Sequence, residues 1–230
     1  MKTLTNIDKA AYIFLIVLFG FGIYFANTNL TYFDEVYTRE DGFIEVASAL
    51  FLLSSSLLLL FRFFKLFKHK ELFWKIGVLG LSIIFFFGAG EEISWGQRIF
   101  NLESSQYFLE NNAQGETNLH NMVVGETKIN KLIFSQLLTA VLVIYLLITP
   151  ILFRKFEWIK NLANKFAVPI VKWHHTISFL IGTLLLLFIS SNRKWEIYEL
   201  AFSVIFLLIF IKPFNKEIYT ANSKTFSKRY

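Results

Sequence analysis

Residues 72–90 read LFWKIGVLGLSIIFFFGAG, an apolar run with one charged residue, Lys75, near its start. A helix of about 20 residues spans the hydrocarbon core of a bilayer, so this stretch predicts a transmembrane helix. Other apolar segments of similar length predict the same, and none shows the two-residue alternation of a β-barrel strand. These segments are Ala10–Ala26, Phe43–Phe61, Leu132–Phe153, Trp173–Ser190 and Trp195–Ile211. The sequence therefore predicts an all-α polytopic membrane protein with a bundle of about six transmembrane helices.

The composition supports the membrane class. Of the 230 residues, 55% are hydrophobic and 17% are charged, and the mean hydropathy is +0.51. Soluble domains carry about 25% charged residues, and a chain of this size cannot bury so much apolar surface by itself. The composition also excludes a disordered chain and a coiled coil. Because the chain has no cysteine, it has no disulfide, thiolate zinc site or cysteine nucleophile.

The distribution of charge predicts the topology. With the N-terminus inside, most of the 23 Lys and Arg residues fall on the cytoplasmic side, as the positive-inside rule requires, and both termini are cytoplasmic. The basic residues follow topology, so no nucleic-acid partner is expected. Most of the 17 acids fall on the outer side. We expect residues 1–212 to form one transmembrane domain, with the outer loop 91–130 packed over its extracytoplasmic end. Residues 213–230 are expected to form a basic tail held loosely near anionic lipid.

Two adjacent acids stand at an unfavourable place. Glu91 and Glu92 follow the apolar run 72–90, at the C-terminus of a helix, where the helix dipole disfavours negative charge. We expect a cation, a bound metal or a proton to compensate. If the helix continues, Trp95 and Arg98 share a face with Glu91, and Arg98 is then a structural partner as an alternative to a functional site.

Other outer acids lie at helix N-termini, where the dipole favours them. Asp41, Glu196 and Glu199 are interpreted mainly as N-terminal capping acids. Glu45 lies one turn deeper, and its role stays open between capping and function.

A second polar cluster surrounds Glu116 and His120. The two residues are four apart, so a helical turn places both on one face, as two metal ligands or as an acid that orients an imidazole. The alternative is a hydrated turn capped by asparagines. His120 is the one histidine predicted outside; His69, His174 and His175 are interpreted as interface residues on the cytoplasmic side.

Together these residues predict one outward-facing polar site. The candidate catalytic residues are Glu91, Glu92, Arg98 and His120. A divalent metal is the candidate cofactor, with Glu91, Glu92, Glu116 and His120 as its candidate ligands. The candidate supporting residues are Glu45, Gln97, Asn118 and Asn121.

Three segments carry a family resemblance. Residues 38–45 (TREDGFIE), 90–98 (GEEISWGQR) and 115–121 (GETNLHN) resemble a group of uncharacterised bacterial multi-pass membrane proteins. The resemblance covers roughly residues 38–122 and implies a location in the bacterial inner membrane. No activity is established for that group, so the resemblance implies no chemistry.

The first functional hypothesis is a membrane enzyme, hydrolase or transferase, that acts on a lipid or lipid-linked substrate. Here Glu91 and Glu92 bind a metal or act as general base, His120 shuttles a proton and Arg98 clamps an anionic group. The second is a non-enzymatic structural or assembly protein whose polar motifs fix the outer loop. The third, a small-solute transporter, is disfavoured because the deep parts of the helices carry no ionisable residue.

Overall fold

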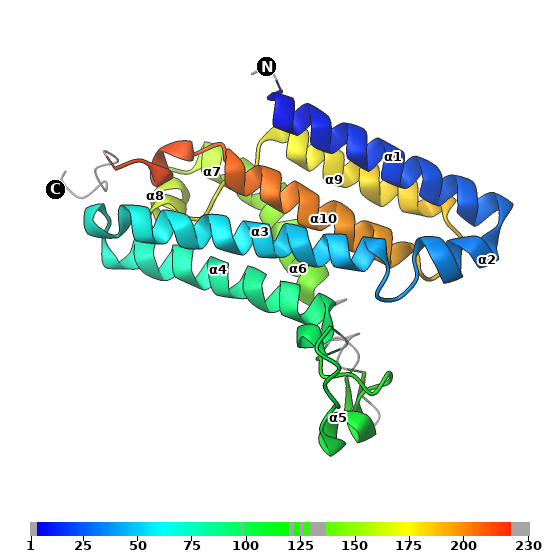
Figure 1. The fold of residues 1–230 in the computed structure, drawn as a ribbon. Helices are drawn as coiled ribbons and strands as arrows, with labels where there is room; N and C mark the ends of the chain where they lie inside the picture. The colour runs from blue at the N-terminus through cyan, green and yellow to red at the C-terminus, as the bar shows by residue number, and fades with distance from the viewer. Residues whose placement is uncertain (1–3, 98, 120–121, 125–126, 129–136, 222–230) are drawn as a thin grey trace.

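A computed structural model describes residues 4–97, 99–119, 122–124, 127–128 and 137–221. Long helices run side by side, and an arm projects from one end of α4 (Figure 1). The α-helices are α1 (Asn6–Thr28), α2 (Leu30–Tyr32), α3 (Phe43–Leu66), α4 (Leu72–Glu92), α5 (Gln106–Asn111), α6 (Leu138–Val143), α7 (Thr149–Lys155), α8 (Glu157–Lys165), α9 (Trp173–Leu185) and α10 (Lys194–Ile211). Short 3-10 helices are η2 (Phe67–His69), η3 (Ser94–Gly96), η6 (Leu186–Phe188) and η7 (Lys216–Tyr219), and π-helical turns are η1 (Phe33–Tyr37) and η5 (Ile144–Ile148). Two short antiparallel strands, β1 (Val123–Val124) and β2 (Thr127–Lys128), complete the described elements.

The helical class is confirmed, and four helices are long and apolar enough to cross a membrane. They are Asn6–Thr28, Phe43–His69, Leu72–Glu92 and Leu138–Lys155. The segment Trp173–Phe188 is apolar but shorter, and α10 carries Lys194, Glu196 and Glu199 in its first turns. A six-span topology therefore remains a prediction. The described N- and C-terminal residues lie at the same end of the helices (Figure 1).

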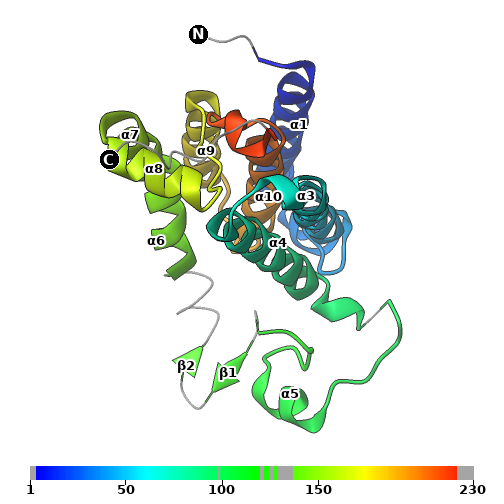
Figure 2. The same cartoon turned by 90° about the vertical axis from the view of Figure 1, so that its left-hand side faces the viewer.

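Helix α10 forms the centre of the bundle. Its sequence is apolar on every side, which is typical of a helix surrounded by protein. Half of its residues are buried, including Ile197, Leu200, Val204 and Ile209, and Trp195 is its one exposed residue. Figure 2 shows it enclosed among its neighbours. The surrounding helices bury one face each and expose large apolar side chains on the other, which is compatible with a multi-pass membrane protein.

Helices α3 and α4 are joined by a reciprocal pair of serines. The Ser56 hydroxyl donates to the Ser82 carbonyl oxygen at 2.8 Å, and the Ser82 hydroxyl donates to the Ser56 carbonyl oxygen at 2.9 Å. Both side chains are buried. Small residues let helices approach closely, and interhelical hydrogen bonds then hold them in register.

A glycine permits a second close approach. A Cβ atom built on Gly77 of α4 would lie 1.7 Å from the Phe166 carbonyl oxygen, just after α8. Only a residue without a side chain fits there. By contrast, a Cβ on Gly80, one turn along α4, meets nothing within 4 Å.

The first apolar run after the arm is irregular for an identifiable reason. Pro150 lies in the first turn of α7, directly after the π-helical turn Ile144–Ile148. Proline has no N–H group, so it cannot complete the regular α-helical ladder of the preceding turn. The prediction of one helix over Leu132–Phe153 is confirmed only from residue 138, because 129–136 lie outside the described residues.

The outer loop differs from its prediction. The sequence predicts that residues 91–130 pack over the end of the bundle. In the structure, the described part of this segment forms an arm of η3, α5, β1 and β2 that extends away from the helices (Figures 1 and 2). Within the described residues the arm joins the body at the end of α4.

The start of the predicted loose tail is also packed, in contrast to the prediction. The Phe214 backbone N–H donates to the Ile170 carbonyl oxygen at 2.7 Å, and the Trp74 indole N–H donates to the Ile218 carbonyl oxygen at 2.9 Å. The Arg62 guanidinium lies 4.1 Å from the centre of the Tyr219 ring. Burial of apolar and aromatic groups outweighs the polar composition here.

We predict that Gly77→Ala destabilises the protein by about 1–3 kcal/mol, because the new methyl group forces apart the backbones of α4 and of Phe166. Gly80→Ala is the matched control. It should be neutral or stabilising by up to about 1 kcal/mol, because alanine favours a helix over glycine. Unfolding in detergent measures both. Equal behaviour of the two variants would show that the contact at Gly77 is not a constraint.

We also predict that Ser56→Ala lowers the free energy of unfolding by about 0.5–2 kcal/mol, because a buried interhelical hydrogen bond is lost. Ser54→Ala is the control. The Ser54 hydroxyl is exposed and bonds only to Leu50 of its own helix among the hydrogen bonds described. A larger loss for Ser54 than for Ser56 would contradict the pairing.

Candidate functional site

Helix α4 ends sharply after Glu92. Ser94, Trp95 and Gly96 have left-handed backbone angles, with φ of 46°, 55° and 76°. The Trp95 ring then folds back onto Gly90, where a Cβ would lie 2.8 Å from the ring. The helix does not continue beyond Glu92, so the condition for a shared helical face of Glu91, Trp95 and Arg98 is not met. Arg98 itself lies outside the described residues.

Two N–H groups hold the Glu91 carboxylate. The Trp95 indole N–H donates to Glu91 Oε1 at 2.9 Å, and the Leu119 backbone N–H donates to Glu91 Oε2 at 2.6 Å. Glu91 is 5% exposed. Donors of this kind stabilise a buried carboxylate. They provide part of the compensation that the sequence required at this helix C-terminus.

Glu116 is the centre of a second set of bonds. Its Oε2 accepts from the Ser94 hydroxyl at 2.7 Å and from the Asn118 amide at 2.9 Å. The Asn118 amide also donates to the Ser94 hydroxyl at 2.9 Å. Asn112 organises the turn below, because its Oδ1 accepts from the backbone N–H groups of Gln114 and Glu116. The turn is capped by an asparagine, and residues 115–119 are not helical.

The two polar motifs therefore meet in space. Besides the contacts of Glu91 and Glu116, the Thr117 backbone N–H donates to Gln97 Oε1 at 2.8 Å. Gln97 and Asn118 therefore hold the loop through hydrogen bonds, and their role as supporting residues of a functional site stays a prediction. His120 and Asn121 lie outside the described residues, so the pairing of Glu116 with His120 stays a prediction.

A separate group of carboxylates gathers from three helices. Glu92 of α4 interacts electrostatically with Glu199 and Glu196 of α10 and with Glu45 of α3, and these charges are all negative. The four side chains are partly buried. We call Glu45, Glu92, Glu196 and Glu199 the carboxylate cluster. It combines the expected Glu92 and Glu45 with two acids that the sequence assigned to capping.

Ser48 adds a polar group beside this cluster. It lies one turn after Glu45 on α3, is 1% exposed, and neighbours the Glu92 side chain. Its hydroxyl has no hydrogen bond of normal geometry among the described residues. The Glu92 carboxylate is the polar group that faces this hydroxyl, and hydrogen bonding from Ser48 favours the charged form of Glu92.

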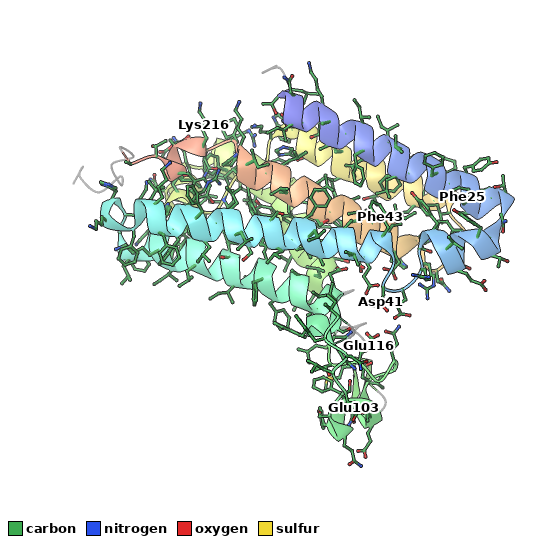
Figure 3. All side chains as sticks on the ribbon, viewed as in Figure 1. Phe25, Asp41, Phe43, Glu103, Glu116 and Lys216 are labelled. Carbon is green, nitrogen blue, oxygen red and sulfur yellow. The ribbon has the colours of Figure 1, made fainter. Side chains whose placement is uncertain are left out.

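The arm and the carboxylate cluster are neighbours. Glu116 acts electrostatically on Glu45, which links the arm to the N-terminal end of α3. In Figure 3, Asp41 precedes α3 at the same end of the bundle from which the arm with Glu103 and Glu116 extends. The described parts of the three motifs quoted from the sequence therefore gather in one region.

The outer acids are not the N-cap residues of their helices, although Glu196 does lie in the first turn of α10, where the dipole favours it. The N-cap of α3 is Gly42 and that of α10 is Arg193, and neither makes a side-chain capping bond. Instead the Glu45 carboxylate accepts the Asp41 backbone N–H. Arg193 pairs with Glu40 at 3.7 Å. The acids of α10 thus lie inside its first turns rather than at its cap.

One group of side chains was missed. Asp8, His174 and His175 lie together at the opposite end of the bundle from the arm, where His175 is fully buried. Their interpretation as interface residues on the cytoplasmic side did not anticipate that His175 is buried within the protein. The signal in the sequence was a His-His pair at the start of one apolar helix and an acid in the first turn of another.

We predict that Glu116→Ala loosens the arm, because the Ser94 hydroxyl and the Asn118 amide lose their acceptor, at a cost of about 1–3 kcal/mol. Limited proteolysis within residues 97–119 should become faster. Glu110→Ala is the control, since Glu110 is exposed and accepts from Gln106 on the same short helix. If the Glu116 variant is cleaved at the same rate as the wild type, the hydrogen bonds of Glu116 with Ser94 and Asn118 do not stabilise the arm.

Comparison of the chain with protein-family models, with curated proteins and with solved structures finds no match.

Proposed function

We propose that this protein is an integral membrane enzyme, a hydrolase or transferase, that acts on a lipid or lipid-linked substrate at the outer surface of a bacterial inner membrane. The observation that carries the proposal is the carboxylate cluster. Four partly buried acids from α3, α4 and α10 converge, and the charges that act on Glu92 are all negative. Evolutionary selection for stability alone disfavours such an arrangement.

Electrostatics supports a binding function. Like charges in a partly buried site repel strongly, and bound protons or a divalent cation must offset that repulsion. Carboxylate oxygens are the preferred ligands of magnesium, manganese and calcium. The ligand atoms of the cluster are not preassembled as tightly as those of Asp8, His174 and His175, so binding a metal here would require movement of side chains.

The proposed roles follow from position. Glu92 and Glu45 bind the cation or accept the proton of an attacking water or hydroxyl group, and Glu199 and Glu196 complete the cluster. The expected proton shuttle His120 and anion clamp Arg98 remain part of the proposal. Glu91 and Glu116 are better suited to holding the arm than to direct chemistry, because their carboxylates already accept hydrogen bonds.

The arm favours a lipid substrate. It runs across the direction of the helices and exposes large apolar side chains. Exposed apolar groups beside a polar site suit the interface between headgroups and acyl chains. The side chains concerned are Trp95, Ile99, Phe100, Leu102, Tyr107 and Leu109.

The second candidate is a structural or assembly protein. The network of Glu91, Ser94, Glu116 and Asn118 favours it, because these bonds fix the arm without any ligand. In that case the exposed apolar groups of the arm contact another membrane protein.

The test combines activity with stability. Purified protein in vesicles of phosphatidylethanolamine and phosphatidylglycerol is supplied with Mg²⁺ or Mn²⁺, and lipid products are measured by mass spectrometry. We predict that Glu92→Gln abolishes lipid turnover yet raises the melting temperature, because it removes repulsion from a site kept for function. Glu35→Gln, an exposed outer acid, should change neither.

Two results would reject the enzyme proposal. In the first, the wild-type protein turns over no lipid in vesicles, and cells that lack the protein have an unchanged lipid profile. The other is a Glu92→Gln variant with full activity. Loss of stability in Glu92→Gln, with no activity in either protein, would favour the assembly candidate.

A further inference from the structure

Three metal-binding side chains gather where α1 and α9 begin. Asp8 of α1 and His174 and His175 of α9 each offer a ligand atom, and these atoms lie within 4.8 Å of one another. Among the described residues this is the only group of three or more His, Cys, Asp or Glu side chains that meets this distance. Asp8 is 4% exposed and His175 is 0% exposed.

His175 has no partner for either ring nitrogen. Nδ1 and Nε2 are both buried, and neither makes a hydrogen bond within the described part of the chain. Neutral imidazole has one donor and one acceptor, and burying both unpaired is costly. A metal ion bound to the acceptor nitrogen removes half of this deficit, and imidazole is the commonest metal ligand in proteins.

The other two residues are already oriented by neighbours. Asp8 Oδ2 accepts from the Thr5 backbone N–H at 2.8 Å and from the Thr5 hydroxyl at 2.7 Å, so Oδ1 can bind an ion without disturbing this cap. The Tyr12 hydroxyl lies 2.6 Å from His174 Nδ1. An ion on Nε2 of that ring keeps the contact with Tyr12. Such outer contacts fix the orientation of ligands in metal sites.

We propose that Asp8, His174 and His175 bind a divalent transition-metal ion, for which zinc is the best match to two imidazoles and a carboxylate. Zinc bonds to these groups are about 2.0–2.2 Å long, so rotation of the side chains must bring the ligand atoms closer than 4.8 Å. Three protein ligands leave one tetrahedral position for water. The positive charge of nearby Lys172 opposes the ion, and the Asp8 carboxylate offsets it.

This site is independent of the proposed function. It lies at the end of the bundle that holds the described termini, whereas the carboxylate cluster lies at the end that holds the arm (Figure 1). It joins the first helix to α9, so a bound ion links α1 to the rest of the bundle. Zinc binding should therefore raise the melting temperature.

The experiment is a zinc titration of the purified full-length protein in detergent, with bound metal measured by equilibrium dialysis and mass spectrometry. Wild type should bind one zinc ion per chain with an increase in melting temperature. Asp8→Asn keeps an oxygen acceptor for Thr5, and His174→Gln keeps a polar side chain. Each should weaken zinc binding about tenfold or more.

His69→Gln is the matched control, because His69 is exposed and belongs to η2 rather than to this group. It should bind zinc as the wild type does. His175→Phe addresses folding: it should melt at least as high as the zinc-free wild type while losing the zinc-dependent shift, because an apolar ring suits the buried position.

The proposal is overturned if wild type binds no zinc at stoichiometric excess, or if Asp8→Asn and His174→Gln bind it as tightly as the wild type. Zinc that is lost in Glu92→Gln but kept in Asp8→Asn also overturns it, since the ion then belongs to the carboxylate cluster. Failure of lipid turnover leaves the zinc result unaffected, so the two proposals fail separately.

Discussion

The contact between Ser56 and Ser82 positions the helices that carry the carboxylate cluster. In a lipid environment an unpaired polar group is costly, so two buried hydroxyls that bond across the helix pair fix its register. This register sets the level of Glu45 on α3 relative to Glu92 on α4. Helix α10 packs against the same pair and contributes Glu196 and Glu199 at that level. The carboxylate cluster therefore depends on contacts deep in the bundle.

The helices were predictable because apolar length is a strong signal. Runs such as 43–61 and 72–90 allow only a helix in lipid, and both are helical. Details that depend on tertiary contacts were not predictable. The packing of residues 213–220 comes from Trp74 and Arg62, which lie far away in the sequence. The direction of the arm is set by residues with left-handed backbone angles after Glu92. The residue types of Ser94 and Trp95 do not predict that conformation.

The candidate site was predictable in composition and only partly in arrangement. The sequence identified Glu91, Glu92 and Glu116, and it indicated that some group must compensate the negative charge of the two acids at the end of a helix. It could not show that backbone N–H groups hold Glu91, because Leu119 reaches it from across the arm. Glu196 and Glu199 were not assigned to the site, because acids at a helix N-terminus are explained by the helix dipole alone. In the structure, both act electrostatically on Glu92. His175 was missed because burial is a property of its neighbours.

The contact at Gly77 also offers a rule for recognising distant relatives. Two segments of backbone touch there, and no flexible side chain intervenes to absorb a change. A related chain that preserves the placement of α8 must therefore keep glycine at this position, whereas Gly80 is free to vary. A sequence with glycine at that level, serines at the two paired positions and the GEE motif at the end of the same helix would share this architecture even where overall identity is too low to detect.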